Sequence, residues 1–134
     1  MEFRDAAALK PDSNFILGHI AAALIETGQL EPARQHCESR SVALSDDNRR
    51  WCLAFVYHLL GRQTDAEREL AELQKSEGDE AAFAYAEIYA TWGDIPAALA
   101  WLATAERKRD PALQSIRASP WLDPLRSYPE FKAI

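Results

Sequence analysis

Three glycines recur along the chain at an almost constant spacing. They are Gly28, Gly61 and Gly93, which are 33 and 32 residues apart. Each is followed five residues later by an alanine, in the strings GQLEPA, GRQTDA and GDIPAA. A glycine between two apolar stretches of helical period is typical of a turn that joins two helices. The spacing therefore predicts a repeat of about 33 residues, made of two helices around a glycine turn.

The residues around these turns fit helix ends. Pro32 and Pro96 fall where a second helix would begin, and a proline costs no hydrogen bond in that first turn. Asp46 is predicted to cap the helix that precedes Gly61, while Thr64 and Glu67 form a capping box for the helix that follows it. The alanines after the glycines are expected to be buried where paired helices approach closely: Ala33, Ala66 and Ala98.

With this period and these small residues, the chain resembles the tetratricopeptide (TPR) repeat family over residues 1 to about 108. The resemblance implies an all-α fold, a right-handed superhelix of helix–turn–helix repeats. Complete repeats are expected at residues 14–46, 47–78 and 79–108, and residues 1–12 match the second helix of an incomplete repeat. Three features depart from the family pattern. Arg50 stands where the family often has a tryptophan or another large apolar residue, and Cys37 stands where an aromatic residue is usual. The proline that commonly closes a repeat is missing after the first two.

Residues 109–134 do not continue the repeat, because four prolines divide them into short pieces. The string PWLDPLRSYPEF resembles a short helical closing segment that follows TPR arrays in bacterial multidomain regulators. Those regulators carry class III adenylyl cyclase, protein kinase or winged-helix domains. The resemblance implies that Trp121, Leu125 and Phe131 fold back over the last repeat. A solenoid needs such a cap, since its terminal repeat otherwise leaves an apolar side in water.

Composition excludes several classes of function. The formal net charge is -6, and the longest basic cluster, residues 107–109, lies at a predicted helix end where cations are favoured by the helix dipole. This pattern argues against nucleic-acid binding. No apolar run approaches the roughly 20 residues of a membrane span. Cys37 and Cys52 form neither a CxxC motif nor a disulfide framework, so reduced thiols and a cytoplasmic location are expected.

The sequence contains no recognisable catalytic, metal-binding or cofactor-binding motif. The histidines lie in separate predicted helices, without the spacing of a metal site. His36 and Cys37 are sequence neighbours, and neighbours on a helix point about 100° apart, which makes a poor nucleophile–base pair. We therefore expect no enzyme, no metal and no cofactor. The only polar residues that could converge in a concave site are too few to indicate a reaction: His19, His58 and Glu87.

In a TPR superhelix, the first helix of each repeat lines the concave side. Helical periodicity places these residues there: Phe15, His19, Trp51, Phe55, His58, Phe83 and Glu87. The aromatic members predict an apolar wall, and large exposed apolar patches usually mark binding sites. A helix or an extended apolar segment of another protein is the expected ligand. Alternatively, these aromatics fill a closed groove, or the chain's own tail lies over them.

The sequence is compatible with two functions. The first is a protein-interaction module or scaffold that binds a partner segment through the concave face. The second is a structural or self-association domain of a larger bacterial regulatory protein. In that case the chain forms a homodimer through the incomplete repeat at residues 1–12.

Overall fold

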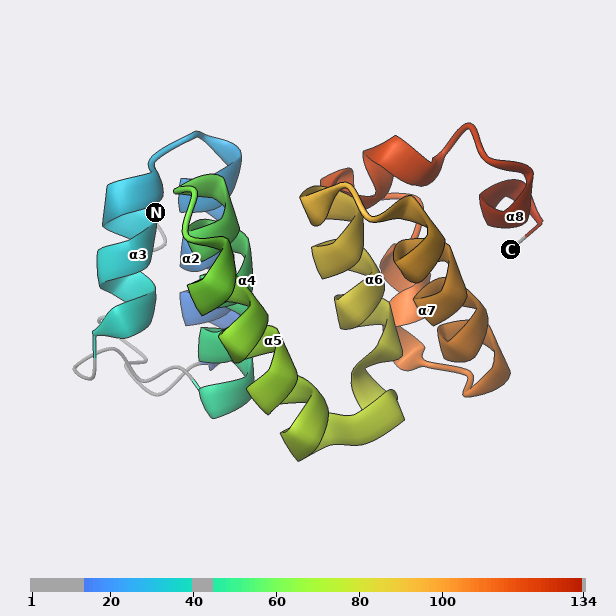
Figure 1. Ribbon diagram of the computed structural model, residues 1–134, viewed down its shortest axis with the longest axis horizontal. Helices are drawn as coiled ribbons and strands as arrows, with labels where there is room; N and C mark the ends of the chain where they lie inside the picture. Colours follow the sequence, from blue (N-terminus) through green and yellow to red (C-terminus); the bar gives the residue numbers. More distant parts are fainter. Residues whose placement is uncertain (1–13, 40–44, 134) are drawn as a thin grey trace. The chain divides into compact units, whose positions relative to one another are not determined.

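The computed structural model describes residues 14–39 and 45–133, with the backbone alone for residues 14–18. Within these ranges every regular element is a helix and no strand occurs, which confirms the predicted all-α class (Figure 1). The incomplete repeat predicted at residues 1–12 lies outside the described residues. The elements are α2 (Asn14–Glu26), α3 (Leu30–Glu38), α4 (Asp46–Leu59), α5 (Gln63–Glu77), η1 (Gly78–Ala81), α6 (Ala82–Trp92), α7 (Ile95–Arg107), η2 (Pro111–Ser115), η3 (Pro120–Leu125) and α8 (Pro129–Lys132), where η marks a 3-10 helix.

The chain divides into two compact units, which we call unit 1 (Met1–Glu72) and unit 2 (Leu73–Ile134). Unit 1 contains α2, α3, α4 and most of α5. Unit 2 contains the end of α5, the α6–α7 hairpin and the C-terminal segment. The division falls inside α5, whereas the predicted repeats meet at its C-terminal end.

A left-handed glycine ends three of the helices with the same pair of hydrogen bonds. Gly28, Gly61 and Gly93 have φ angles of 75°, 80° and 85°. Each glycine N–H donates to the carbonyl three residues back, and the next N–H donates to the carbonyl five residues back. This pair of bonds is the Schellman motif, and glycine adopts the required φ without a Cβ clash. The three predicted turns are therefore confirmed.

The same motif ends α7 without a glycine. Arg109 has a φ of 52°, its N–H donates to the Glu106 carbonyl at 3.1 Å, and the Asp110 N–H donates to the Ala105 carbonyl at 2.9 Å. A left-handed φ strains any residue with a Cβ. The helix dipole favours the basic residues 107–109 at this helix end. Their charge does not predict the left-handed conformation of Arg109.

The alanines of the repeat are buried, as predicted. Ala33, Ala66 and Ala98 are each 0% exposed. The N–H of each one donates to the carbonyl four residues back, at the start of the second helix of its hairpin. A glycine turn followed by a buried alanine thus recurs with the same geometry in all three hairpins.

Two predicted helix caps are wrong. The N-cap of α4 is Ser45, whose Oγ accepts from the Asn48 N–H at 3.2 Å, and Asp46 is already the first helical residue. Serine and aspartate both cap well, so the backbone decides: Ser45 has the extended φ and ψ that the N-cap position requires. The α5 helix begins at Gln63, so Thr64 lies inside the helix and does not cap it.

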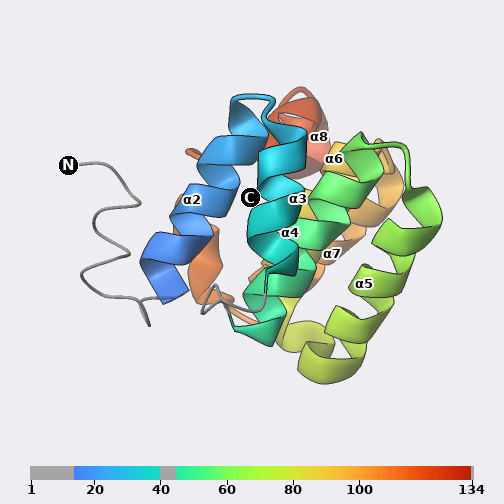
Figure 2. The ribbon, with the colours of Figure 1, turned by 90° about the vertical axis from the view of Figure 1, so that its left-hand side faces the viewer.

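In unit 1 the α2, α3 and α4 helices pack against one another (Figure 2). Six consecutive residues of α4, from Cys52 to Tyr57, are buried. Consecutive residues on a helix point in all directions, so α4 is covered on every side over this stretch. It is the central helix of the part of unit 1 that the structure describes.

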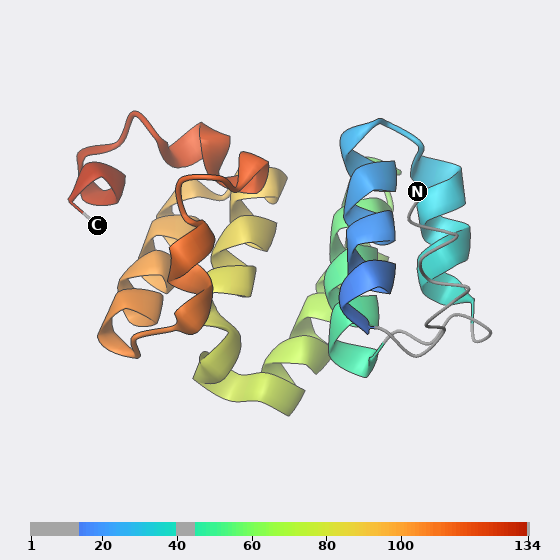
Figure 3. The same cartoon turned by 180° about the vertical axis from the view of Figure 1, so that it is seen from behind.

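In unit 2 the α6 and α7 helices form a hairpin, and η3 lies along α6 (Figure 3). Leu122 and Leu125 are 0% exposed in one apolar cluster with residues of both helices, and Phe131 packs against that cluster. The expected packing of Leu125 and Phe131 is therefore present, but Leu122 takes the place predicted for Trp121. A 3-10 helix has three residues per turn, so residues i and i+3 share its buried face.

Candidate functional site

The residues predicted for a concave face lie on α2, α4 and α6, and their exposure differs. The side chain of Phe15 lies outside the described part. His19 is exposed, while Trp51, His58 and Glu87 are partly buried. Phe55 and Phe83 are only 0% and 3% exposed. The expectation that these two phenylalanines form an exposed apolar wall is wrong, because each is part of a packed interior.

On α6 the chain's own C-terminal segment lies where a ligand was predicted (Figure 3). The hydroxyl of Ser119 donates to Glu87 Oε2 at 2.7 Å, and Ser119 is buried. The backbone N–H of Phe83 donates to Asp110 Oδ2 at 3.2 Å. Phe83 also shares the apolar cluster that holds Leu122. For α6, the alternative that the tail covers these residues is the one observed.

In unit 1 His19 is exposed, and Trp51 and His58 are partly buried. The Trp51 and Phe55 rings lie 4.6 Å apart between centroids at an angle of 57°, so the buried phenylalanine supports the tryptophan. Nδ1 of His58 lies 2.5 Å from Oε1 of Gln63, across the turn that joins α4 to α5. His19 lies on α2, which packs against α4. We call His19, Trp51 and His58, which the repeat pattern predicts on one side of these two helices, the α2–α4 face.

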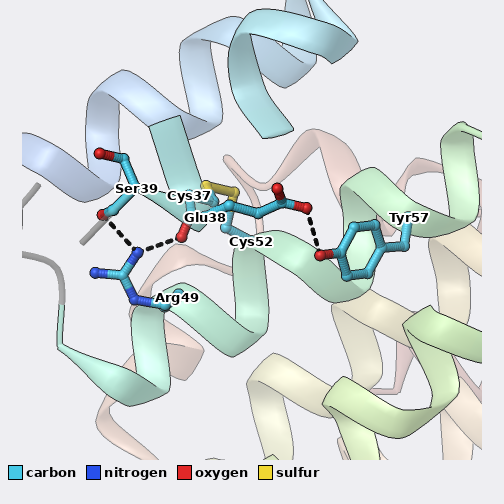
Figure 4. Close-up of a disulfide and its surroundings, with 6 residues drawn as sticks. All are labelled: Cys37, Glu38, Ser39, Arg49, Cys52 and Tyr57. Atoms are coloured by element: carbon cyan, nitrogen blue, oxygen red, sulfur yellow. Dashed lines mark hydrogen bonds between the residues drawn. A yellow bond between two sulfur atoms is a disulfide. The ribbon is translucent and has the colours of Figure 1, made fainter. Parts of the chain in front are cut away.

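An unpredicted cluster joins the end of α3 to α4 (Figure 4). Cys37 forms a disulfide with Cys52, so the expectation of free thiols is wrong. Tyr57 donates its hydroxyl hydrogen to Glu38 Oε2 at 2.6 Å. The guanidinium of the buried Arg49 donates to the carbonyls of Cys37 and Ser39. The last two residues of α3 and its C-cap Ser39 are thus held by three α4 side chains, those of Cys52, Tyr57 and Arg49. We call this cluster the α3–α4 clamp.

A signal for this disulfide was present in the sequence. Cys37 follows Ala33 by four residues, so the two share one face of a helix, and that face was already predicted to be buried. Cys52 lies in the apolar run of the next helix. Two cysteines that face the same helix–helix contact can meet even though 15 residues separate them. A search for short motifs misses such a pair.

A cavity of about 220 Å³ opens beside the clamp, within unit 1. Its lining is Glu38, Asp46, Arg49, Arg50, Leu53, Tyr57 and Glu69. Arg50, at the position where the TPR pattern often has tryptophan, makes an ion pair with Glu69 at 3.4 Å. Burial raises the pKa of the Glu69 carboxyl, and the charge of Arg50 opposes this shift.

Several charged residues of this lining are engaged in ion pairs and hydrogen bonds. Glu38 accepts from Tyr57 through one oxygen and from Arg34 through the other, at 2.7 Å. Glu69 forms an ion pair with Arg50. The lining residues include no histidine and no cysteine, and the one hydroxyl among them, that of Tyr57, donates to Glu38.

Over the described ranges, no three His, Cys, Asp or Glu side chains gather as ligands of a metal ion would. No helix in those same ranges is long and apolar enough to cross a membrane. Comparisons with protein-family models, characterised proteins and solved structures find no match to this chain.

Proposed function

We propose that the chain is a protein-interaction module or scaffold, and that unit 1 binds a partner segment on the α2–α4 face. The observation that carries this proposal is the threefold recurrence of one hairpin, with the same glycine turn and the same buried alanine. Repeated hairpins of this kind typically stack into scaffolds that present a row of first helices to a partner. The resemblance to the TPR family supports the same function.

The α2–α4 face offers side chains suited to such contact. Trp51 is partly buried against Phe55, so its ring is already oriented before a partner arrives. A preoriented aromatic loses little freedom on binding and can supply much of the contact energy. None of the three residues of this face is a lysine or arginine, which argues against a clamp for a terminal carboxylate.

The C-terminal segment indicates what kind of ligand a first helix of this chain accepts. On α6 that segment is a 3-10 helix which buries Leu122 and Leu125 and bonds Ser119 to Glu87. A segment with two apolar side chains three residues apart, and one hydroxyl beside them, is therefore able to pack against such a helix. We expect the partner of unit 1 to present a short helical or extended segment of this character.

The test is a pull-down from source-cell lysate with wild type and two variants. His19→Ala/Trp51→Ala changes the α2–α4 face, and Glu67→Ala/Arg68→Ala changes exposed residues of α5 as a matched control. We expect one protein to be retained by wild type and the control and lost by the face variant. Circular dichroism should show that both variants are folded.

Light scattering on the same samples separates this function from self-association. The proposal requires wild type and both variants to be monomers. If wild type is a dimer that only the face variant converts to a monomer, the α2–α4 face is a contact between copies and the proposal is wrong. Equal retention by all three proteins would also contradict it.

A further inference from the structure

We infer that the Cys37–Cys52 disulfide is a permanent staple of unit 1, and that the chain works in an oxidising compartment. This inference is independent of the proposed partner. The predicted cytoplasmic location was argued from reduced thiols, and the disulfide removes that basis. The compartment determines which proteins the chain can meet, so the inference also restricts the set of partners.

The disulfide joins two helices that are successive in the chain. Cys37 lies in the last turn of α3 and Cys52 in the second turn of α4, with their Cα atoms 6.3 Å apart. This separation is within the usual range for disulfides. Both cysteines are 0% exposed. The bond therefore lies inside the α3–α4 contact and not on the surface of the unit.

The backbone around Cys37 is held independently of the sulfur atoms. Arg49 binds the carbonyls of Cys37 and Ser39, and Tyr57 binds the side chain of Glu38 (Figure 4). These bonds keep the end of α3 against α4 while the disulfide forms. They also keep the two sulfur atoms together if the bond is broken. The surrounding structure thus favours the oxidised form.

Burial distinguishes this bond from a redox-active one. Disulfides that exchange in function present an accessible sulfur whose thiolate is stabilised by its surroundings. Here a thiolate reductant must approach a sulfur of a cysteine that is 0% exposed. Exchange therefore has to wait until α3 separates from α4, and such openings are rare in a packed core.

The oxidation that forms the disulfide indicates the kind of compartment in which the chain folds. Two thiols lose two protons and two electrons as the sulfur–sulfur bond forms, and a disulfide oxidant of the exchange class accepts them and becomes a dithiol. Oxidising compartments maintain such oxidants, whereas cytosolic thiol systems keep protein cysteines reduced. A buried structural disulfide is accordingly typical of proteins that fold outside the reducing cytosol.

The first test measures the redox state of the natural protein. Source cells are quenched with acid and dissolved in denaturant with N-ethylmaleimide, so that buried thiols also react, and the protein is weighed by mass spectrometry. We expect no maleimide adduct before chemical reduction and two after it. Two adducts without prior reduction would show free thiols in the cell and would overturn the inference.

The second test asks whether the staple is permanent. Purified oxidised protein is treated with dithiothreitol in native buffer and in denaturant, and free thiols are followed over time. We expect reduction to be at least about 100-fold slower in native buffer, because it requires opening of unit 1. Rates within a few-fold of each other would identify an accessible, exchangeable disulfide and contradict the inference.

Discussion

Ala66 is fully buried in the first turn of α5, at a position whose equivalents in the other hairpins are also alanine. A leucine there adds three carbon atoms at a position that is 0% exposed. We expect Ala66→Leu to lower the free energy of unfolding by about 1–3 kcal/mol, measured by denaturant titration. Ala71→Leu is the matched control, since Ala71 is exposed on the same helix. Equal effects of the two substitutions would contradict the predicted close approach.

Arg109 takes the place of a turn glycine at the end of α7. A Cβ added at the turn glycines would meet no heavy atom within 4 Å, so the left-handed φ and not space favours glycine in these motifs. Arg109 has that φ and carries the strain. We expect Arg109→Gly to raise the free energy of unfolding by about 0.5–1 kcal/mol.

The control for this prediction is Arg107→Gly, which places glycine inside the last turn of α7. There the helical φ suits any residue, and glycine costs about 1 kcal/mol relative to a good helix former. The two glycine substitutions should therefore change thermal stability in opposite directions. Two changes of the same sign would show that Arg109 is not strained.

At the scale of elements, the α3–α4 clamp links stability to alkaline pH through Tyr57. Burial raises the pKa of this phenol above its ordinary 10.0, and the hydrogen bond to Glu38 raises it further. A group whose pKa is higher in the folded chain contributes stability below its unfolded pKa and loses that contribution as the pH rises through the folded value. The free energy of unfolding should therefore fall as the pH rises above about 10.

Tyr57→Phe tests this link. The variant should be less stable than wild type by about 1 kcal/mol at neutral pH, because the bond to Glu38 is lost. It should also lose less stability between neutral and strongly alkaline pH. Tyr128→Phe, at an exposed tyrosine, is the control and should leave the alkaline loss unchanged. A full alkaline loss in Tyr57→Phe would show that another group is responsible.

How far the sequence predicts each element depends on its periodicity. The glycine turns and buried alanines follow from a spacing that repeats three times, and the structure has them where expected. For the C-terminal segment, the resemblance to closing segments of TPR arrays implies that Trp121 packs on the last repeat together with Leu125. The 3-10 geometry of the segment instead buries Leu122 and Leu125. In the sequence, only the prolines indicate that the segment does not follow an α-helical period.

The exposed aromatic wall failed for a different physical reason. A row of helix residues that does not pack within its own hairpin need not be exposed to solvent, because neighbouring segments can cover it. The run from Cys52 to Tyr57 is apolar in all directions around the helix, which already indicates a helix buried on every side. For α6, the covering segment is the chain's own C-terminus, and no local pattern of α6 reveals it.

At the scale of the whole molecule, the disulfide should act on one unit only. Both cysteines belong to unit 1, and the clamp around them involves no residue of unit 2. A disulfide that closes a loop of this length contributes roughly 3 kcal/mol. Hydrogen exchange should therefore become faster in α3 and α4 of a Cys37→Ala/Cys52→Ala variant, while α6 and α7 keep the rates of wild type. Equal acceleration in both units would contradict this separation.

The most direct test of the proposed function is a photo-crosslinker placed on the α2–α4 face. Benzoylphenylalanine replaces the exposed His19 in one protein and the exposed Arg68 of α5 in another, and each is irradiated in source cells. We predict an adduct between position 19 and a different protein, which is absent when the crosslinker occupies position 68. An adduct to a second copy of this chain, or the same adducts from both positions, would contradict binding of a partner segment at this face.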